Sequence, residues 1–343
     1  MSTVSAPTIP EVGLTLPGNY DETDPSGGLE ETLQLFSLAE ELRYQVAGVR
    51  QRHLERGLSS ALPFLAAASQ RTSTIRLETA VVPLGYETPF RLAEDFATVD
   101  VLSRGRLNVG ISSSAPHLDV LRPLGRGADD GAGVEPYTLI ARFLEALEGR
   151  DLSDEAILTP YGPQIPRIQP HVPSLRDRVW LGGGSARSVR WAAEHGLKLF
   201  LGNLTAADGD APFETVQRAR IDEYYAAFTG SGEPAVGVER VIVTTDSATA
   251  AQRAHYADFA AGREERTLAP TRGLVFQKDL VGTADEIVER LHADPAIDGR
   301  TRVRVALPYA FHHDEYRQIL TDIAEGVLPR LGWRPAATRA VAA

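Results

Sequence analysis

The amino-acid sequence predicts an α/β fold of the (β/α)8 TIM barrel type, and three observations support that prediction. Short apolar runs alternate with amphipathic segments along the chain, a pattern typical of βαβ units around a parallel sheet. About eight of these runs read as strands, the number that closes such a barrel. The length of 343 residues suits one large barrel with rim insertions, although length alone would also fit two smaller domains.

The expected strands and helices follow one another in regular order. Strands are predicted at residues 12–17, 46–51, 75–82, 106–112, 179–183, 197–203, 236–244 and 303–308. Helices are predicted at residues 29–42, 62–71, 89–103, 136–149, 186–196, 212–228, 247–262 and 283–294, and a last packing helix over 314–333. We expect these elements to form a single domain, 1–343, with flexible ends at 1–10 and 333–343.

Two long connections interrupt this order. The first, 158–178, is rich in proline, and the second covers 262–282. Long connections in compact domains are usually functional or disordered. We therefore interpret both as irregular rim loops or lids.

The stretch AEDFATVDVLSRGRLNVGIS, residues 93–112, is the most sharply punctuated helix-to-strand unit. Gly105 stands where a left-handed helix cap is expected, so the chain can turn directly into the next strand. In that strand Asn108 and Ser112 share one face. The inward face of a barrel strand tolerates polar groups near its C-terminal mouth, where ligands bind. Asn108 and Ser112 are therefore predicted to point toward a site.

The same alternation applies to the preceding strand. Its inward residues are predicted to be Arg76, Glu78, Ala80 and Val82, and its outward residues Ile75, Leu77, Thr79 and Val81. An inward Glu78 needs a partner to remain buried, and Arg50, Arg76 and Arg106 are the candidates. We interpret Glu78 as half of a structural ion pair, with a substrate contact as the alternative.

Composition narrows the range of functions. Lys and Arg number 35 against 46 Asp and Glu, and the net charge of −11 argues against a nucleic-acid partner. Cysteine is absent, which excludes disulfides, thiol catalysis and cysteine-held metal centres. No apolar run reaches the ~20 residues that a bilayer requires, and the N-terminal residues do not resemble a signal peptide. A cytoplasmic protein that acts on a small molecule is the expectation.

Two patterns suggest chemistry. GGGSARS at 182–188 ends a strand and opens a helix, so its backbone N–H groups can hold a phosphate, although a plain turn capped by Ser185 explains it equally. His53 follows the second strand at the barrel mouth, where an imidazole can exchange protons near neutral pH, unless it is structural. The HHDE stretch at 312–315 lacks the spacing of metal ligands, and we predict no metal.

The run TSTIRLETAVVPLGYETPFRLAEDFATVDVLSRGRLNVGIS, residues 72–112, resembles the core signature of the bacterial luciferase-like flavin-dependent monooxygenases. The resemblance extends through VRQRHLERG before it, and through DRVWLGGGSARSVRWAAEHGLKLFLGN and LVGTADEIVERL after it. It covers most of residues 10–332. The family fold is a single luciferase-like (β/α)8 barrel, which agrees with the strand count.

The resemblance implies roles for particular residues. Gly183, Gly184, Ser185 and Ser188 match the loop that holds the flavin phosphate, and Thr79 and Ala80 match the segment that lies against the flavin ring, in some members through a non-proline cis peptide. His53 matches the second histidine of a luciferase pair, while Arg52 replaces the first, so light emission is disfavoured. Arg52 would instead bind an anionic substrate or stabilise a peroxide anion, or be a solvated or salt-bridged arginine. Asn108 and Ser112 are expected as further cofactor contacts. The loop GISSSAP at 110–116 replaces a loop that is usually glycine-rich in the family. Ser112, Ser113 and Ser114 would donate hydrogen bonds to flavin or substrate there, although a plain polar loop explains them equally.

The resemblance also implies an activity. The leading expectation is a monooxygenase that uses reduced FMN from a separate flavin reductase and O2 to oxidise a small organic substrate through a flavin C4a-hydroperoxide. The first alternative is an F420-dependent hydride-transfer oxidoreductase, and the second is a non-catalytic flavin-binding protein. Family barrels often pair, so a homodimer is expected. The identity of the substrate stays open, because fold does not fix function.

Overall fold

The computed structural model describes residues 8–114, 117–121, 135–268, 271–309 and 311–335. Within them, parallel strands close into the predicted (β/α)8 barrel. Its eight strands are β1 (Val12–Leu16), β2 (Val46–Val49), β3 (Arg76–Thr79), β5 (Leu107–Ser112), β8 (Val179–Gly182), β9 (Lys198–Leu201), β11 (Val236–Thr244) and β14 (Arg302–Ala306). Pairing of β14 with β1, in the register Val303 opposite Val12, closes the ring.

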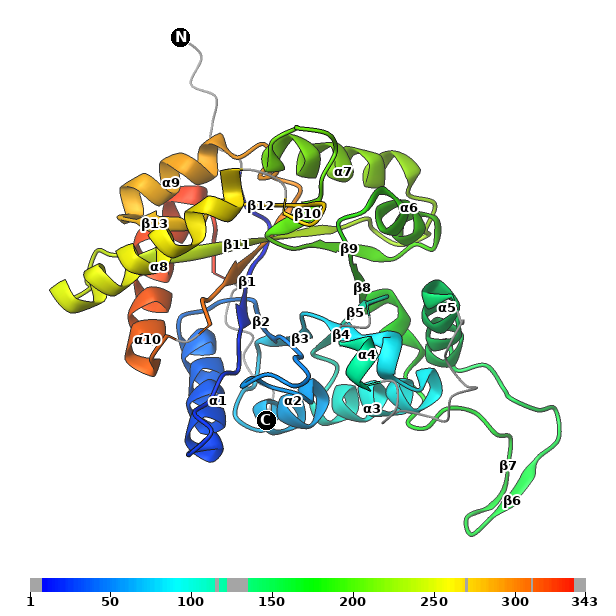
Figure 1. The fold of residues 1–343 in the computed structure, drawn as a ribbon. Helices are drawn as coiled ribbons and strands as arrows, with labels where there is room; N and C mark the ends of the chain where they lie inside the picture. Colours follow the sequence, from blue (N-terminus) through cyan, green and yellow to red (C-terminus); the bar gives the residue numbers. More distant parts are fainter. Residues whose placement is uncertain (1–7, 115–116, 122–134, 269–270, 310, 336–343) are drawn as a thin grey trace.

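Helices surround the barrel in the order that the sequence predicts (Figure 1). They are α1 (Pro25–Glu41), α2 (Ala61–Ser69), α3 (Pro89–Leu102), α5 (Pro136–Leu147), α6 (Ala186–Glu194), α7 (Phe213–Ala227), α8 (Ala250–Leu268), α9 (Ala284–Ala293) and α10 (His313–Asp322). Their apolar faces and the outer face of the barrel form one continuous hydrophobic core. No described helix is both long and apolar enough to cross a membrane.

The prediction of an irregular stretch at 262–282 was wrong. Helix α8 continues to Leu268, and two short strands follow, β12 (Leu274–Phe276) and β13 (Leu280–Gly282). β13 extends the sheet beside β11, while β12 pairs antiparallel with β10 (Leu204–Ala206). Tyr256 is the buried residue of α8, so apolar residues do not recur at helical spacing along this helix. The sequence pattern therefore did not predict these elements.

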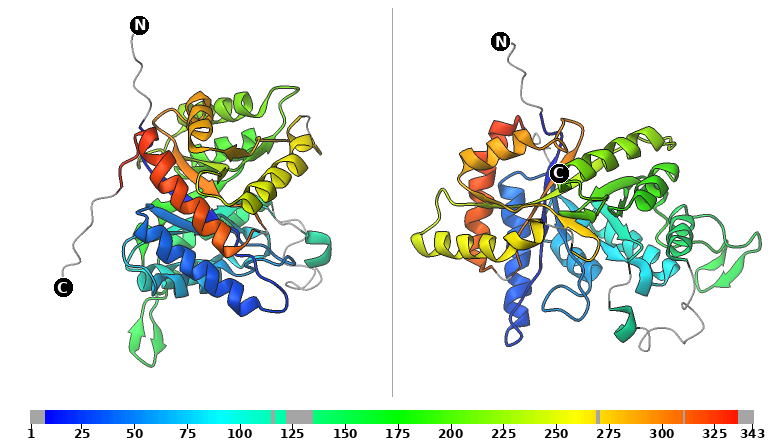
Figure 2. Two further views of the ribbon diagram at one scale, coloured as in Figure 1. Left: turned by 90° about the vertical axis from the view of Figure 1, so that its left-hand side faces the viewer. Right: turned by 45° about the horizontal axis from the view of Figure 1, so that its top comes forward.

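The other long connection is partly ordered. It contains the hairpin β6 (Ile157–Thr159) and β7 (Gly162–Gln164), which projects away from the barrel in Figure 1 and in both views of Figure 2. A 3-10 helix, Pro173–Arg178, then leads into β8. Further rim elements are β4 (Val82–Pro83), a 3-10 turn at Leu84–Tyr86 and α4 (Leu118–Leu121).

The ends of the chain pack against the barrel at two points. Ile9 is buried, and its N–H donates to the carbonyl of Leu331 over 3.4 Å. Trp333 is also buried and donates from its indole to Gln45 Oε1 over 2.8 Å. The remaining parts of the ends predicted to be flexible, 1–7 and 336–343, lie outside the described residues. The last predicted helix ends at Asp322 and is continued by a π turn and a 3-10 turn to Leu331.

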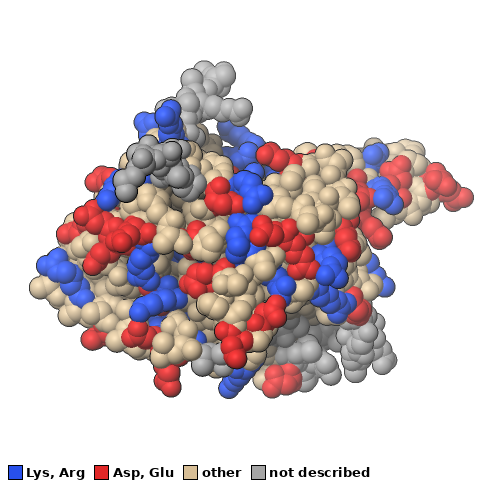
Figure 3. Space-filling view, turned by 90° about the horizontal axis from the view of Figure 1, so that it is seen from above, with Lys and Arg blue, Asp and Glu red and all other residues tan. Residues whose placement is uncertain are grey.

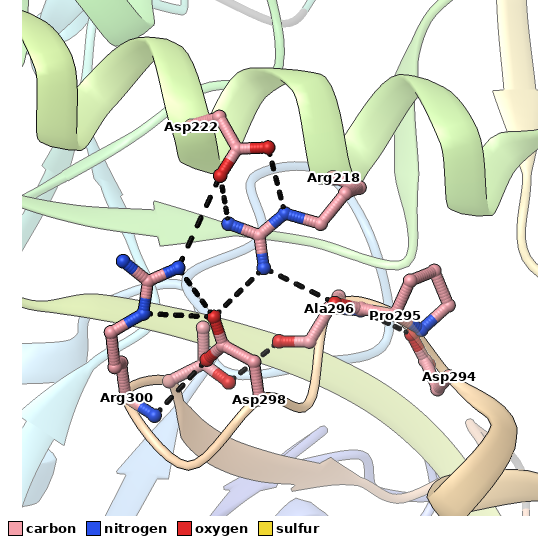
Figure 4. Close-up of polar contacts among 8 residues, drawn as sticks. Arg218, Asp222, Asp294, Pro295, Ala296, Asp298 and Arg300 are labelled. Carbon is pink, nitrogen blue, oxygen red and sulfur yellow. Dashed lines mark hydrogen bonds and ion pairs between the residues drawn. The ribbon is translucent and has the colours of Figure 1, made fainter.

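An ion-pair network ties α7 to the loop that precedes β14 (Figure 4). Arg218 of α7 donates to Asp222 over 2.5 Å and to Asp298 over 2.9 Å, and Arg300 donates to the same Asp298 over 2.6 Å. Because this loop leads into the N-terminal end of β14, the network lies at the stability face of the barrel, away from the C-terminal mouth.

Acidic and basic side chains are intermixed over the face of the molecule seen in Figure 3. Many of the surface charges form pairs, such as Arg91 with Glu94 and Asp95 at 2.6 Å each. Exposed pairs of this kind contribute only ~0–1 kcal/mol each to the free energy of unfolding.

Candidate active site

An open pocket of about 160 Å³ lies at the C-terminal ends of β2, β3 and β5. TIM barrels place their ligand sites at this end of the strands. Its lining residues are Arg50, Gln51, Arg52, His53, Glu55, Ala80, Val81, Pro83, Ser112, Ser114 and His117. Five residues that the sequence singled out are therefore brought together in one pocket: His53, Arg52, Ala80, Ser112 and Ser114.

The peptide bond Ala80–Val81, at the wall of the pocket, is cis. Val81 contacts the inner face of the barrel, because its Cγ1 lies beside the positions of Gly110 and Gly182, while Val82 is buried in the outer core. The prediction that Val82 points inward and Val81 outward was therefore wrong. Strand β3 ends at Thr79 and β4 begins at Val82, so the regular alternation of side chains is interrupted between them.

Thr79 holds two strands together at the base of this wall. Its hydroxyl donates to the carbonyl of Gly110 over 2.7 Å and accepts from the N–H of Gly110 over 2.8 Å. A Cβ at Gly110 would lie 1.7 Å from the Thr79 carbonyl oxygen, so only glycine permits this approach. Thr79 thus fixes the backbone from which Ala80 reaches the pocket.

Asn108 lies deeper than the pocket. Its Nδ2 donates to Glu78 Oε2 over 3.0 Å, and Arg304 donates to both oxygens of Glu78 over 2.7 and 3.0 Å. Arg304 also pairs with Glu11 at 2.8 Å. Glu78 is thus half of an ion pair, as interpreted from the sequence, but its partner is Arg304 rather than Arg50, Arg76 or Arg106. Because β14 and β3 are distant in sequence, strand order alone did not reveal this contact.

Burial and neighbouring carboxylates act in opposite directions on Arg304. Its guanidinium is fully buried, which disfavours the charged form, but Glu78 and Glu11 outweigh burial and raise the pKa of Arg304. At Glu11 burial likewise opposes the charge, and Arg304 and Arg302 lower the pKa of the carboxyl below its usual value. Arg304 and Glu11 therefore compensate each other's charge in the barrel interior below the pocket.

A second ion pair joins β2 to β11 inside the barrel. Arg50 Nη2 lies 2.6 Å from Glu239 Oε2, and Glu239 is only 1% exposed. Burial opposes the charge of Arg50, but Glu239 and Tyr309 outweigh it and raise the pKa of Arg50. Sequence reasoning did not identify Glu239, because a single carboxylate in the run VGVERVIVT gives no sign of its partner.

Arg50 Nε, Glu239 Oε1 and Thr15 Oγ1 are among the buried polar atoms that have no hydrogen-bond partner within the described residues, and Trp180 Nε1 in the barrel interior is another. Buried polar groups normally have a partner. One donor, one acceptor and one hydroxyl are a suitable set for the polar edge of a heterocycle that carries both N–H and C=O groups. The pyrimidine end of a flavin or a deazaflavin is such an edge, so the residues present fit either cofactor.

His53 lies at one side of the pocket in a small polar group. Its Nε2 is 3.3 Å from Gln51 Nε2, and its ring packs edge-on against Tyr86 at 5.3 Å between centroids. Gln51 Nε2 also donates to Glu87 Oε1 over 3.4 Å. Burial raises the pKa of Glu87, and the hydrogen bond from Gln51 and the nearby His53 offset part of that rise. Sequence analysis did not identify Gln51 and Glu87 as site residues, although both lie in stretches that carry the family resemblance.

Arg52 contacts Tyr309 from the loop after β14. Its Nη2 donates to the Tyr309 hydroxyl over 2.9 Å, and the guanidinium lies over the ring, 5.4 Å from its centroid. Arg52 also lies 3.7 Å from Glu55. The side chain is about two-fifths exposed, at 39%, so the guanidinium remains accessible from the pocket.

The loop at 182–188 folds as the capped turn that the sequence offered as the simpler interpretation. Ser185 Oγ accepts from the Ser188 N–H over 3.1 Å, and Ser188 Oγ accepts from the Ser185 N–H over 3.1 Å. A Cβ at Gly183 would lie 2.6 Å from Ser188, and one at Gly184 would lie 2.8 Å from Thr205. The glycines are therefore required by packing, and the two hydroxyls are engaged in capping α6.

Ser112 and Ser114 form the opposite wall of the pocket, with their hydroxyl oxygens 2.7 Å apart. Residues 115 and 116, which complete the predicted loop, lie outside the described part of the chain. The region therefore presents hydroxyl groups at the pocket, where the sequence predicted hydrogen-bond donors.

A family model described as luciferase-like monooxygenase matches residues 11–297. The chain therefore belongs to the luciferase-like monooxygenase family. Among curated relatives, a protein of Escherichia coli strain K12 named luciferase-like monooxygenase is 27% identical over 184 residues, which cover 52% of this chain and 50% of that protein. The chain spans about half the length of the curated relatives it matches.

Two solved structures resemble the barrel over nearly its whole length. The oxygenating constituent of 3,6-diketocamphane monooxygenase from Pseudomonas putida, in complex with FMN, has a TM-score of 0.68 at 15% identity and covers 94% of this chain and 98% of its own. The coenzyme F420-dependent tetrahydromethanopterin reductase from Methanopyrus kandleri has a TM-score of 0.61 at 15% identity and covers 95% and 100%. At these identities the likeness concerns the fold alone.

Proposed function

We propose that the protein is a monooxygenase that binds reduced FMN in the pocket at the barrel mouth and transfers one oxygen atom from O2 to a small organic substrate. The observation that carries this proposal is the convergence of His53, Arg52 and Ser112 with Arg50 on one pocket, together with the unpartnered buried atoms Arg50 Nε and Glu239 Oε1. Membership of the luciferase-like monooxygenase family supports it. The bound flavin would supply the activation of O2.

The residues of the chain bind, orient and transfer protons. Arg50 Nε and Glu239 Oε1 would hold the polar edge of the ring system, and Ala80 and Val81 would lie against its face. Thr79 sets this wall through its bonds to Gly110. Asn108 keeps Glu78 in place below the pocket, so that its contribution to binding is indirect.

His53 and Arg52 would act on the oxygen and substrate side of the pocket. His53 would exchange a proton with the reacting oxygen, and Arg52 would attract an anionic group. We also propose that Gly183, Gly184, Ser185 and Ser188 contact the cofactor phosphate through backbone N–H groups that the cap leaves available.

An F420-dependent hydride-transfer enzyme is the second candidate. The solved F420-dependent relative shares the barrel, and a deazaflavin offers the same pyrimidine edge to Arg50 and Glu239. A separate flavin reductase, a homodimer and a cytoplasmic location remain predictions from the family resemblance and the sequence, as does a single domain over 1–343.

The test uses isotopically labelled oxygen. The purified protein is combined with FMN, NADH, a separate flavin reductase and a panel of ketones, aldehydes, alkanes and sulfonates under 18O2, and the products are analysed by mass spectrometry. One 18O atom in a product, absent when the protein is omitted, is the expected result. No labelled product from the panel, together with hydride transfer from reduced F420 to any carbonyl tested, would contradict the proposal and favour the second candidate.

A further inference from the structure

We propose that Gln51 is a positioning residue that holds His53 as the Nδ1–H tautomer, with His53 Nε2 as a hydrogen-bond acceptor. Only the catalytic consequence of this inference rests on the proposed function, because the tautomer affects the reaction only if His53 faces the reacting groups. The tautomer itself follows from the contacts of Gln51. Three partners surround this side chain: His53, Glu87 and the first turn of α2.

The amide of Gln51 has a fixed orientation. Its Oε1 accepts from the Ala61 N–H at the start of α2 over 3.1 Å. Ser60, at the N-cap of α2, makes no capping bond with its side chain, so Gln51 supplies an acceptor that this helix end otherwise lacks. A backbone N–H can only donate. The oxygen of the amide must therefore face Ala61, and Nε2 must face the other way.

On that other side the two protons of Gln51 Nε2 meet two partners. Glu87 Oε1 lies 3.4 Å away and His53 Nε2 lies 3.3 Å away. An amide NH2 has two donors and no acceptor. His53 Nε2 can therefore form a hydrogen bond with Gln51 only through its lone pair. In the neutral ring this places the proton on Nδ1.

The alternative arrangement has a physical cost. With the proton on His53 Nε2, two N–H donors would face each other at 3.3 Å and neither would be satisfied. Rotation of the ring is opposed by Tyr86, whose ring stands at 81° to that of His53. Gln51 therefore selects one tautomer by hydrogen bonding while Tyr86 restricts the ring plane.

Charged groups around the ring come from several elements. Glu87 lies beyond Gln51, and Glu55, Arg52, Arg50 and His117 line the same pocket. Glu55 is paired with His117 at 3.6 Å and with Arg52 at 3.7 Å. The contact with Gln51 Nε2 decides which nitrogen carries the proton in the neutral ring.

The consequence concerns what the pocket offers to a ligand. His53 Nδ1 has no hydrogen-bond partner among residues in the described part of the chain, and the ring lines the pocket. In its neutral form His53 would then present an N–H donor to a bound molecule rather than a lone pair. It would stabilise a developing negative charge on oxygen.

The experiment measures the tautomer directly by 15N NMR of histidine-labelled full-length protein without flavin, at a pH where imidazole rings are neutral. His53 is assigned among the eight histidines by the signal lost in His53→Gln. In the wild type the proton is expected on Nδ1. Gln51→Leu should reduce that preference about fivefold, the effect of one net hydrogen bond. Gln51→Glu should reverse it, because a carboxylate accepts from Nε2–H.

Two controls make the result specific. Gln252→Glu introduces the same change of charge at the start of α8, where Gln252 Oε1 accepts from the Thr249 N–H, and should leave His53 unchanged. Glu87→Gln keeps the Gln51 amide in place and should preserve the Nδ1–H form. A wild-type proton on Nε2, or an unchanged tautomer in both folded Gln51 variants, would overturn the inference. Because no flavin is present, this outcome is independent of whether the protein is a monooxygenase.

Discussion

The Arg304 guanidinium lies 2.7 Å from the Glu78 carboxylate inside the barrel, and neither side chain is more than 2% exposed. The pair joins β14 to β3 across the lumen and is extended by Glu11 and Asn108. Removing one partner of a buried pair leaves an uncompensated charge, whereas replacing both by apolar residues is often neutral. This asymmetry can be measured.

Arg304→Met should lower the free energy of unfolding by about 3–5 kcal/mol, because Glu78 and Glu11 lose their cation. The double variant Arg304→Met, Glu78→Leu should recover a large part of that loss. Urea unfolding followed by circular dichroism gives both values. Equal stability of the single variant and the wild type would show that the pair does not hold the strands together.

Glycine is required at Gly110 by the close approach of Thr79. A Cβ there would lie 1.7 Å from a backbone oxygen, which cannot move without displacing the wall of the pocket. Gly110→Ala should therefore destabilise the fold strongly or prevent its accumulation. The matched control is Gly262→Ala in α8, where a Cβ meets nothing within 4 Å and a gain of about 1 kcal/mol is expected. Thermal unfolding of both variants tests the contrast, and a loss at both positions would contradict it.

The stability should depend on pH through Glu87. Because burial raises the pKa of Glu87, the folded state retains this proton over a pH range in which the unfolded chain has released it. The contribution of Glu87 to stability therefore falls as pH rises from its usual value of 4.5 toward the raised value. The substitution Glu87→Gln should abolish this fall in stability with rising pH.

Urea titrations of the wild type and Glu87→Gln at several pH values measure the effect. The stability of the variant relative to the wild type should increase as pH rises through that range and then become constant. Glu31→Gln, an exposed glutamate of α1, serves as the control. A relative stability that decreases with pH would have the wrong sign for a buried carboxyl.

His53→Ala should lower the rate of substrate oxidation by about 10²–10⁴-fold, the range for loss of a proton-transfer group. Binding of the cofactor should change little, because the polar edge of the ring would contact Arg50 and Glu239. Single-turnover kinetics and equilibrium binding separate the two effects. His292→Ala, on the exposed side of α9, should retain full activity, and an equal loss there would point to a general effect on folding.

Much of the barrel could be predicted from the sequence because its strands and helices each bury an apolar face. Residues 93–112, for example, contain the apolar face of a helix, the glycine that ends it at Gly105 and the alternating side chains of the next strand. The inward position of Ser112 followed from the same alternation. Local patterns of this kind need no knowledge of distant parts of the chain.

The contacts that the sequence did not reveal join residues far apart in the chain. Arg304 and Glu78 are separated by 226 positions, and Arg50 and Glu239 by 189. Gln51 and Glu87 meet only because α2 and α3 follow adjacent strands. The interruption of the strand between Thr79 and Val82 also cannot be predicted from strict alternation of side chains. For this reason the predicted orientations of Val81 and Val82 were the reverse of those in the structure.

The central claim, that the pocket at the barrel mouth holds a reduced flavin, is tested most directly by an anaerobic titration. Wild type and Glu239→Leu are titrated in parallel with reduced FMN and reduced F420, and each complex is then mixed with oxygen. Tight binding of FMN by the wild type, weakened in Glu239→Leu, with an absorbance change on oxygen addition is the predicted result. Binding of F420 without reaction with oxygen, or binding of neither cofactor, would contradict the claim.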